Sequence, residues 1–113
     1  MRTATICKAF TFDAAHQLPN HDGKCRFLHG HTYRVELELH GPVREPDGRS
    51  DGGMVVDFAE VKRAWKPLHD RLDHSFLNDA IPSDYRPTTA ENIAHFILDM
   101  LSKDLPALMS VRV

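Results

Sequence analysis

Cysteine is scarce in this chain, which has only two in 113 residues. With so few cysteines, and without the apolar core of an export signal in residues 1–8, the chain is typical of a reducing cytoplasm. Excess positive charge is also absent, because the formal net charge is −2, and this argues against nucleic acid as a partner. No apolar run approaches the length of a membrane span. We therefore expect a cytoplasmic protein that binds neither nucleic acid nor membrane.

The length is sufficient for one hydrophobic core, so we expect a single domain over residues 1–113. Alternation of apolar and polar residues predicts two strands, over residues 3–15 and 31–43. Turn formers between them, such as Pro19 and Gly23, predict a connecting loop.

A first helix is expected to begin after Asp57, which is a suitable N-cap with Glu60 three residues further on. Its apolar residues repeat at helical spacing. This stripe consists of Phe58, Val61, Trp65, Leu68 and Leu72. Pro67 is expected to kink this helix or to end it early, because proline removes a backbone hydrogen bond. A loop is then expected over residues 73–87.

A second helix start is predicted by Thr88 with Glu91, and Thr89 is the alternative cap. The expected buried stripe of this helix consists of Ile93, Ile97, Met100 and Leu101. A last strand begins near Ser110. The element order is therefore β-β-α-α-β, which predicts an α+β domain whose antiparallel sheet is covered on one face by both helices.

The most informative motif is Cys-x-x-x-His-Gly-His over residues 25–31, which follows an isolated His16. Histidines at i and i+2 of a strand project to the same face, about 6.5 Å apart along the backbone. His29 and His31 share the parity of the apolar residues that follow, so they are expected to point inward. With His16 they predict a zinc site of three nitrogen ligands and one open position, with Cys25 beside the metal. The alternative is an accidental pairing, since the chain has eight histidines.

Asp73 and His74 lie where the first helix gives way to a loop, and loops often display functional side chains. One interpretation is a solvated helix end, because neighbouring side chains usually diverge. The other is that Asp73 orients His74, which transfers a proton to or from Cys25 or a substrate. A thiol close to a metal and an imidazole can act as a general base.

Five motifs in this chain resemble, in the same order, those of the pyruvoyl-tetrahydropterin synthase family, and they extend over nearly the whole sequence. The motifs are Phe12-Asp13-Ala14-Ala15-His16, Cys25-x-x-x-His29-Gly30-His31, Val56-Asp57-Phe58, Leu72-Asp73-His74 and Pro87-Thr88-Thr89-Ala90-Glu91-Asn92. The spacing of Cys25 from His29 is most similar to the bacterial branch of the family, which forms 6-carboxy-tetrahydropterin in the queuosine (7-deazapurine) pathway.

This resemblance implies a zinc-dependent lyase. The zinc ligands would be His16, His29 and His31. Cys25 would accept a proton, with Asp73 and His74 as a relay. The substrate would be 7,8-dihydroneopterin triphosphate, and the products 6-carboxy-tetrahydropterin, acetaldehyde and triphosphate.

The resemblance also implies the tunnelling fold (T-fold), in which sheets join around a ring. Its members are commonly hexamers made of two trimers with sites between subunits, so we expect a homo-oligomer. Family members continue the strand that begins near Val111, place a pterin-anchoring glutamate after it and add a last strand. This sequence ends at Val113, so we expect the sheet to lack its final strand. For these residues alone we expect weak pterin binding and poor oligomer stability.

Further expectations concern contacts with the substrate. Lys24 and Arg26 flank the cysteine, and they are either triphosphate contacts or solvated loop charges. Thr88, Thr89 and Glu91 are either part of the pterin pocket or helix-capping residues.

Three other functions remain open. The first is a sister activity on the same substrate, either pyruvoyl-tetrahydropterin formation or side-chain cleavage for folate synthesis. The second is a zinc-stabilised binding module without turnover, and the third is a simple zinc hydrolase. Replacing Cys25 by alanine distinguishes them: the synthase loses turnover and keeps zinc, a structural site that uses the thiol loses zinc, and the hydrolase tolerates the change.

Overall fold

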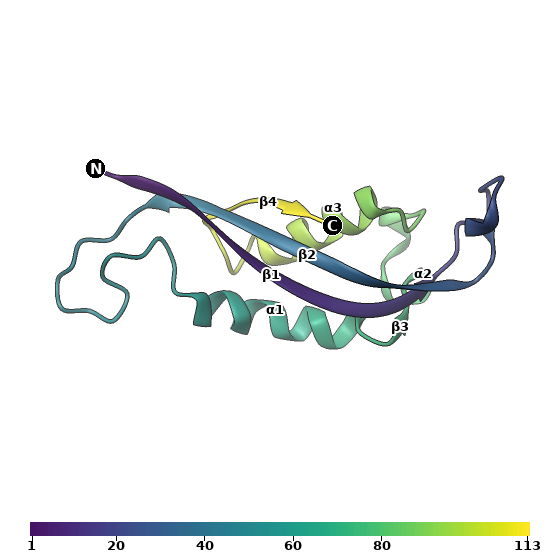
Figure 1. The fold of residues 1–113 in the computed structure, drawn as a ribbon, viewed down its shortest axis with the longest axis horizontal. Coiled ribbons are helices and arrows are strands. Elements are labelled where there is room, and N and C mark those ends of the chain that lie inside the picture. Colours follow the sequence, from purple (N-terminus) through teal and green to yellow (C-terminus); the bar gives the residue numbers. More distant parts are fainter.

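Two 14-residue strands form the spine of the molecule, β1 (Thr3–His16) and β2 (His29–Pro42), and they pair antiparallel along their whole length. The computed structural model describes residues 1–113 and is elongated, with principal extents of 55 × 22 × 21 Å. The β1–β2 connection lies at one end of this ribbon, and the long loop between β2 and the first helix lies at the other (Figure 1). The two strands predicted from alternation are confirmed, with bounds that differ by one or two residues.

The alternation follows from the burial of one face of the ribbon. Phe12, Ala14 and His16 of β1 are buried, and the residues between them are more exposed. The buried residues of β2 are Tyr33, Val35, Leu37 and Leu39. A strand with one face on a core requires this period of two, because successive side chains point to opposite faces.

The sheet has four strands in the order β3-β1-β2-β4. Strand β4 (Leu108–Arg112) pairs antiparallel with β2, whereas β3 (Ser75–Phe76) pairs in parallel with β1. The sheet is therefore antiparallel except for the two residues of β3. The expected loop over residues 73–87 contains this strand, the one-turn helix α2 (Leu77–Ala80) and the 3₁₀ turn η2 (Ser83–Tyr85).

Helix α1 (Phe58–Leu72) begins as predicted at Asp57, whose side chain accepts a hydrogen bond from the Ala59 backbone N–H at 2.9 Å. Its stripe is buried except for Phe58, which is 43% exposed. The prediction that Pro67 would end the helix early is wrong. Pro67 lies on the exposed face, where solvent can satisfy the carbonyl that loses its partner, while the buried side of the helix holds the turn in place.

Helix α3 (Ala90–Leu101) is capped by Thr89, whose side chain accepts from the Asn92 N–H at 3.2 Å, so the alternative cap is the one used. Thr88 is fully buried, and its backbone carbonyl contacts the His16 ring. Phe96 joins the buried stripe in place of Met100, which is 45% exposed. Helices α1 and α3 pack with the inner face of the sheet in one core, as predicted (Figure 1). None of the helices has the length and apolar character needed to cross a membrane.

Candidate metal centre and active site

Three histidines meet at the end of the β1–β2 ribbon. The antiparallel register places His16 opposite His29, and Ala14 opposite His31, so all three imidazoles are on the core-facing side. Their ring centroids are 4.5 Å (His16 to His29), 5.2 Å (His16 to His31) and 4.8 Å (His29 to His31) apart. One nitrogen from each ring lies within 4.8 Å of the others. We call these three residues the histidine cluster; the predicted parity of His29 and His31 and the observed register of the two strands bring them together.

Hydrogen bonds fix the tautomer of two of the rings. His16 Nδ1 lies 2.9 Å from the Thr88 carbonyl oxygen, and His29 Nδ1 lies 2.7 Å from the Phe27 carbonyl oxygen. A carbonyl only accepts, so each Nδ1 carries a proton and donates it. The lone pair of each neutral ring is then on Nε2, the arrangement in which a carbonyl behind the ring orients a metal ligand.

The Nε2 atom of His29 is buried and has no hydrogen-bond partner. A buried acceptor without a partner is costly in a folded protein, and a bound cation removes this cost. Burial is the main cause that lowers the pKa of His16, and the neighbouring His29 and His31 act in the same direction, against the Thr88 hydrogen bond. Burial therefore favours the neutral form of His16, which is the form that binds a metal. Three imidazole nitrogens are a donor set that zinc accepts, so the residues fit a zinc ion.

The cluster is closed on one side and open on the other. His16 is buried, His29 is partly buried and His31 is exposed. His31 lies on the core-facing side, as expected, but its side chain is exposed. A metal held by these three residues would keep a coordination position on the exposed side for water or substrate, as catalytic zinc sites do.

Tyr33 forms the inner wall of the cluster. Its ring lies edge-on to His16 and His31, with centroid distances of 5.9 and 5.6 Å, and it stacks on Phe12 at 4.9 Å. The hydroxyl is buried without a partner, and burial raises the pKa of Tyr33 to about 12. The sequence pattern predicted only that this residue belongs to the core.

Cys25 lies in the β1–β2 connection, within the 3₁₀ turn η1 (Lys24–Arg26). The Leu18 N–H donates to the Cys25 carbonyl at 2.8 Å, which closes this loop back towards β1. The thiol is free and partly buried, and it is not among the clustered ligand atoms. Lys24 and Arg26 are exposed on either side of it, and the Arg26 guanidinium lies 4.9 Å from the centroid of the Phe27 ring.

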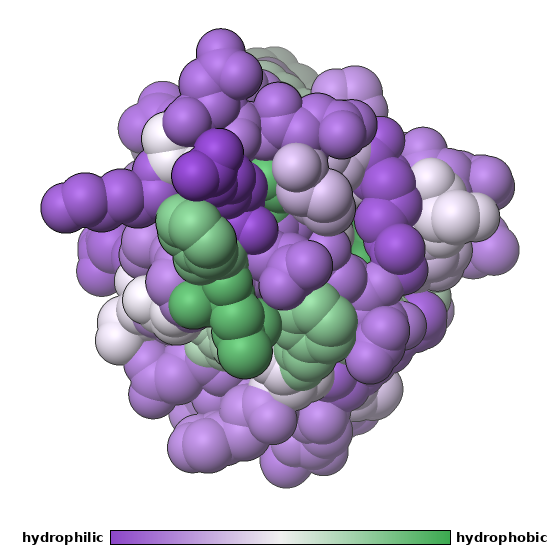
Figure 2. Space-filling model, turned by 90° about the vertical axis from the view of Figure 1, so that its right-hand side faces the viewer, coloured by the Kyte–Doolittle hydropathy of each residue, from purple (hydrophilic) through white to green (hydrophobic).

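The loop end of the molecule is mostly hydrophilic, with a few small hydrophobic areas among the polar side chains (Figure 2). Phe27 and Leu28, just before the cluster, are 60% and 64% exposed. Two exposed apolar residues beside a candidate site are consistent with a surface that contacts substrate or another chain.

Asp73 and His74 do contact each other. His74 Nδ1 lies 2.9 Å from Asp73 Oδ2, and the other carboxylate oxygen accepts from the Asp13 backbone N–H at 2.9 Å. His74 adopts φ 56°, an uncommon left-handed conformation, while its own N–H donates to the Asp13 carbonyl at 2.6 Å. These bonds tie the pair to the edge of β1 and turn the imidazole towards the carboxylate.

This geometry shifts both pKa values in the direction expected of an ion pair. The hydrogen bond from the Asp13 N–H is the main cause that lowers the pKa of Asp73, and the bond to His74 adds to it. The hydrogen bond to Asp73 is the main cause that raises the pKa of His74. The solvated-helix-end interpretation is therefore incomplete, because the carboxylate holds the exposed imidazole in one orientation.

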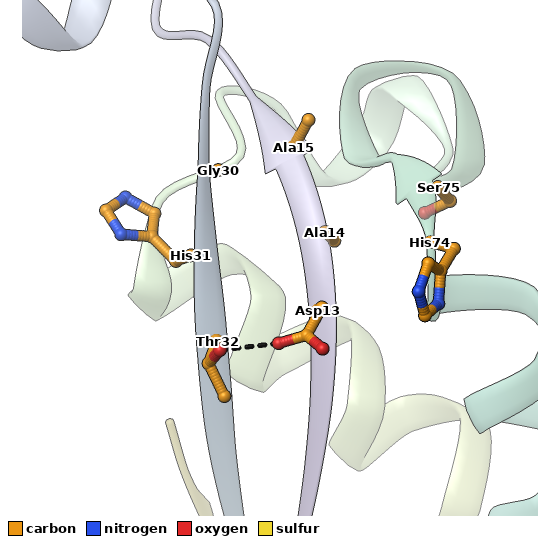
Figure 3. Close-up of a pocket in the computed structure, with 8 residues that line it drawn as sticks. All are labelled: Asp13, Ala14, Ala15, Gly30, His31, Thr32, His74 and Ser75. Atoms are coloured by element: carbon orange, nitrogen blue, oxygen red, sulfur yellow. Dashed lines mark hydrogen bonds between the residues drawn. The ribbon is translucent and has the colours of Figure 1, made fainter.

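No hydrogen bond joins the Asp73–His74 pair to the histidine cluster within one chain. His74 and His31 both line one shallow hollow, together with Asp13, Thr32 and Ser75, and the Thr32 hydroxyl donates to Asp13 there. Figure 3 shows His31 and His74 on opposite sides of the β1–β2 strand pair. Within one chain, the Asp73–His74 pair therefore lies at the β1 edge of the sheet, and the His31 ring lies on the opposite side of the strand pair.

The segment before α3 contacts the cluster from behind. Thr88 is fully buried, and its carbonyl holds His16. Thr89 is used as the cap of α3, and Glu91 is exposed in the first turn of that helix. Sequence reasoning missed Asn78, whose side chain bonds to both Gln17 and Thr88. No local pattern identifies it, because its partners are remote in the sequence.

Comparison with known proteins agrees with this architecture. The solved structure of 6-pyruvoyl tetrahydropterin synthase from Caenorhabditis elegans superposes with a TM-score of 0.81 at 29% identity, covering 98% of this chain and 87% of that one. The Plasmodium vivax structure of the same name, at 24% identity and a TM-score of 0.68, shares the fold, and covers 98% of this chain and 87% of its own. The long ribbon, the mixed sheet and the helices on one face define a tunnelling-fold protein.

The chain belongs to the 6-pyruvoyl tetrahydropterin synthase family, whose model matches residues 5–113. A relative from Synechocystis sp., named 6-carboxy-5,6,7,8-tetrahydropterin synthase, is 43% identical over 110 residues, covering 96% of this chain and 83% of that protein. A relative of the same name from Haemophilus influenzae is 36% identical over 121 residues, covering 88% of this chain and 82% of that protein.

Proposed function

We propose that this chain is a zinc-dependent 6-carboxy-5,6,7,8-tetrahydropterin synthase of queuosine (7-deazapurine) biosynthesis. It would convert 7,8-dihydroneopterin triphosphate to 6-carboxy-tetrahydropterin, acetaldehyde and triphosphate. The names of the relatives at 43% and 36% identity support the choice of reaction. The observation that carries the proposal is the histidine cluster, in which two rings donate their Nδ1 protons to carbonyls and keep Nε2 for a metal.

In this proposal the metal ligands are His16, His29 and His31. When bound, zinc supplies a Lewis acid that polarises the oxygen groups of a substrate side chain and makes neighbouring protons more acidic. The Thr88 and Phe27 carbonyls keep the ligand rings in the required tautomer before any metal arrives. The exposed side of the cluster, next to His31, admits the substrate.

Proton transfer is assigned to Cys25, Asp73 and His74. The thiol of Cys25 is free and lies in the loop that leads into the cluster, and we propose it as the proton acceptor. Asp73 holds the Nδ1 side of His74, so the Nε2 side of that imidazole is left to give and take protons. The raised pKa of His74 favours the protonated ring as a proton donor.

We propose that a second copy of the chain completes the active site. Within one chain, His74 and His31 lie on opposite sides of the strand pair (Figure 3). A homo-oligomer, as a hexamer of two trimers, would bring the Asp73–His74 pair of one subunit to the histidine cluster of the next. Mixing tests this: His29→Ala and His74→Ala, each inactive alone, would recover part of the activity when refolded together. Mixtures that stay inactive contradict the shared site.

Substrate contacts are proposed on the residues around the open side of the cluster. Lys24 and Arg26 are exposed beside Cys25 and carry the positive charge that a triphosphate requires. Thr89 and Glu91 are proposed for the pterin ring. Thr88 is fully buried against His16, so we propose that its contribution to substrate binding passes through that ligand.

The test is incubation of zinc-loaded protein with 7,8-dihydroneopterin triphosphate, with and without a chelator, followed by mass spectrometry of the products. The proposal predicts 6-carboxy-tetrahydropterin and acetaldehyde, lost when the chelator removes the metal. A pyruvoyl-tetrahydropterin product would indicate the activity for which the C. elegans relative is named. A dihydropterin product that has lost its side chain would indicate the sister activity that serves folate synthesis. Zinc binding without turnover would instead indicate a binding module.

A further inference from the structure

We propose that Asn78 is a positioning residue of the metal centre. It would hold His16 in place through hydrogen bonds to the two groups that support His16, the backbone of Gln17 and the residue Thr88. This inference rests on the metal-binding part of the proposed function and is independent of the reaction. Asn78 lies in the one-turn helix α2, partly buried, and none of its atoms is among the clustered ligand atoms. Its effect must therefore pass through other residues.

The first support of His16 is its own backbone. His16 is the last residue of β1, and the chain leaves the strand at Gln17. Asn78 Oδ1 accepts from the Gln17 N–H at 3.1 Å, and Asn78 Nδ2 donates to the Gln17 carbonyl at 2.9 Å. A side chain that satisfies both groups of one residue mimics a neighbouring strand. Asn78 thus continues, by two residues, the parallel pairing that β3 makes with Ala14 and Ala15.

The second support is the Thr88 carbonyl, which accepts the Nδ1 proton of His16. The Thr88 hydroxyl donates to Asn78 Oδ1 at 3.2 Å, and it also lies 3.4 Å from His16 Nδ1. Thr88 is fully buried, so no solvent replaces this bond if it is lost. One amide group therefore sets the position of both the backbone and the hydrogen-bond acceptor of His16.

His29 provides an internal comparison. Its Nδ1 donates to the Phe27 carbonyl two residues earlier in the same loop, and none of the Asn78 bonds reaches it. Loss of the Asn78 bonds should therefore loosen one ligand of three and leave the other two in place. A general loss of fold stability would instead affect the whole ribbon.

The experiment measures the dissociation constant of Zn²⁺ by competition with a chromophoric chelator, on protein whose folding is verified by chemical denaturation of the metal-free form. Asn78→Ala and Thr88→Val are expected to weaken zinc binding by about 10- to 100-fold, the usual effect of losing a group that orients a ligand. Their double variant should be no weaker than the weaker single variant by more than about 3-fold, because both changes break one path. The visible spectrum of the Co²⁺-loaded variants should change as His16 loosens.

Two controls separate positioning from structure. Asn20 is exposed, lines a hollow beside the β1–β2 connection together with Asn78 and makes no side-chain hydrogen bond, so Asn20→Ala should keep wild-type affinity. Thr88→Ser retains the hydroxyl and should also bind as the wild type does. If Asn78→Ala fails to fold, Thr88→Val, which removes only the hydroxyl, carries the same test.

Two results overturn the inference. Zinc affinities of Asn78→Ala and Thr88→Val within about 2-fold of wild type, with only the free energy of unfolding lowered, would show a merely structural role. A wild-type chain that binds no zinc would refute the metal site itself, and with it this inference. The first result leaves the proposed function standing, so the two failures are distinguishable.

Discussion

Replacing Tyr33 by phenylalanine should stabilise this protein, although the residue is in the core beside the candidate site. The hydroxyl is buried without a hydrogen-bond partner, and burial of such a group costs about 1–3 kcal/mol. Tyr33→Phe removes that cost and keeps the ring, which stacks on Phe12 at 4.9 Å and 15°. We expect the free energy of unfolding to rise by about 1–2 kcal/mol, which is a Tm increase of roughly 3–8 °C for a domain of this size.

The assay is urea denaturation of the metal-free protein in the presence of a chelator, so that only the fold is measured. Tyr85 is the matched control, because the chain has two tyrosines and the Tyr85 hydroxyl donates to Asp99 at 2.7 Å. Tyr85→Phe loses a hydrogen bond and should destabilise, the opposite sign. A loss of 1 kcal/mol or more in Tyr33→Phe would refute the reasoning, since it would show that the hydroxyl has a partner in solution.

The same substitution should change how the free energy of unfolding depends on pH in the alkaline range. Burial raises the pKa of Tyr33 to about 12, whereas an unfolded tyrosine titrates near about 10. Above pH 10 the unfolded chain loses this proton first, so stability present below that pH is lost as the pH rises towards 12. Tyr33→Phe should remove the part of this loss of stability that comes from Tyr33. If the free energy of unfolding of Tyr33→Phe fell with pH in parallel with that of the wild type, the burial of the hydroxyl would be contradicted.

Three further predictions concern the site. Cys25→Ala should lower turnover by about 10²- to 10⁴-fold, the range for a lost general base, with zinc content and folding unchanged; a variant that loses zinc would show that the thiol is a ligand. His29→Ala should abolish stoichiometric zinc, measured by elemental analysis of dialysed protein, and retention of one zinc per chain would exclude the cluster as the site. Asp73→Asn should lower the pKa of His74 in an NMR titration towards the ordinary value of about 6.5, because the main cause of its increase is removed. In the wild type this pair should stabilise the fold fully between about pH 3.9 and 6.5; its contribution is lost as the pH falls through the lowered pKa of Asp73 or rises through the raised pKa of His74. A pKa of His74 unchanged in Asp73→Asn would contradict the pairing.

The long strands and the histidine cluster could be predicted because each depends on a short-range pattern. A period of two determines which face a strand residue occupies, and the hairpin register then brings His16 opposite His29. The start of helix α1 is predictable, because Asp57 caps it, but the effect of Pro67 is not, because its exposed position within a packed helix depends on tertiary contacts.

The residues that hold the site residues in position could not be predicted in the same way. Strand β3 has two residues and α2 has four, too few to give a periodic signal. The contact between Asp73 and His74 depends on the left-handed φ of His74, which its bonds to β1 impose. Asn78 acts on residues that only the folded chain brings near, so its role appears only once the structure is known.

The most direct test of the central claim is an anomalous difference map, recorded at the zinc absorption edge, from crystals of zinc-loaded protein. The account predicts one strong peak in each chain, about 2.0–2.1 Å from Nε2 of His16 and of His29 and within coordination distance of His31. No peak at the histidine cluster, or a peak bonded to the Cys25 sulfur at about 2.3 Å, would contradict it.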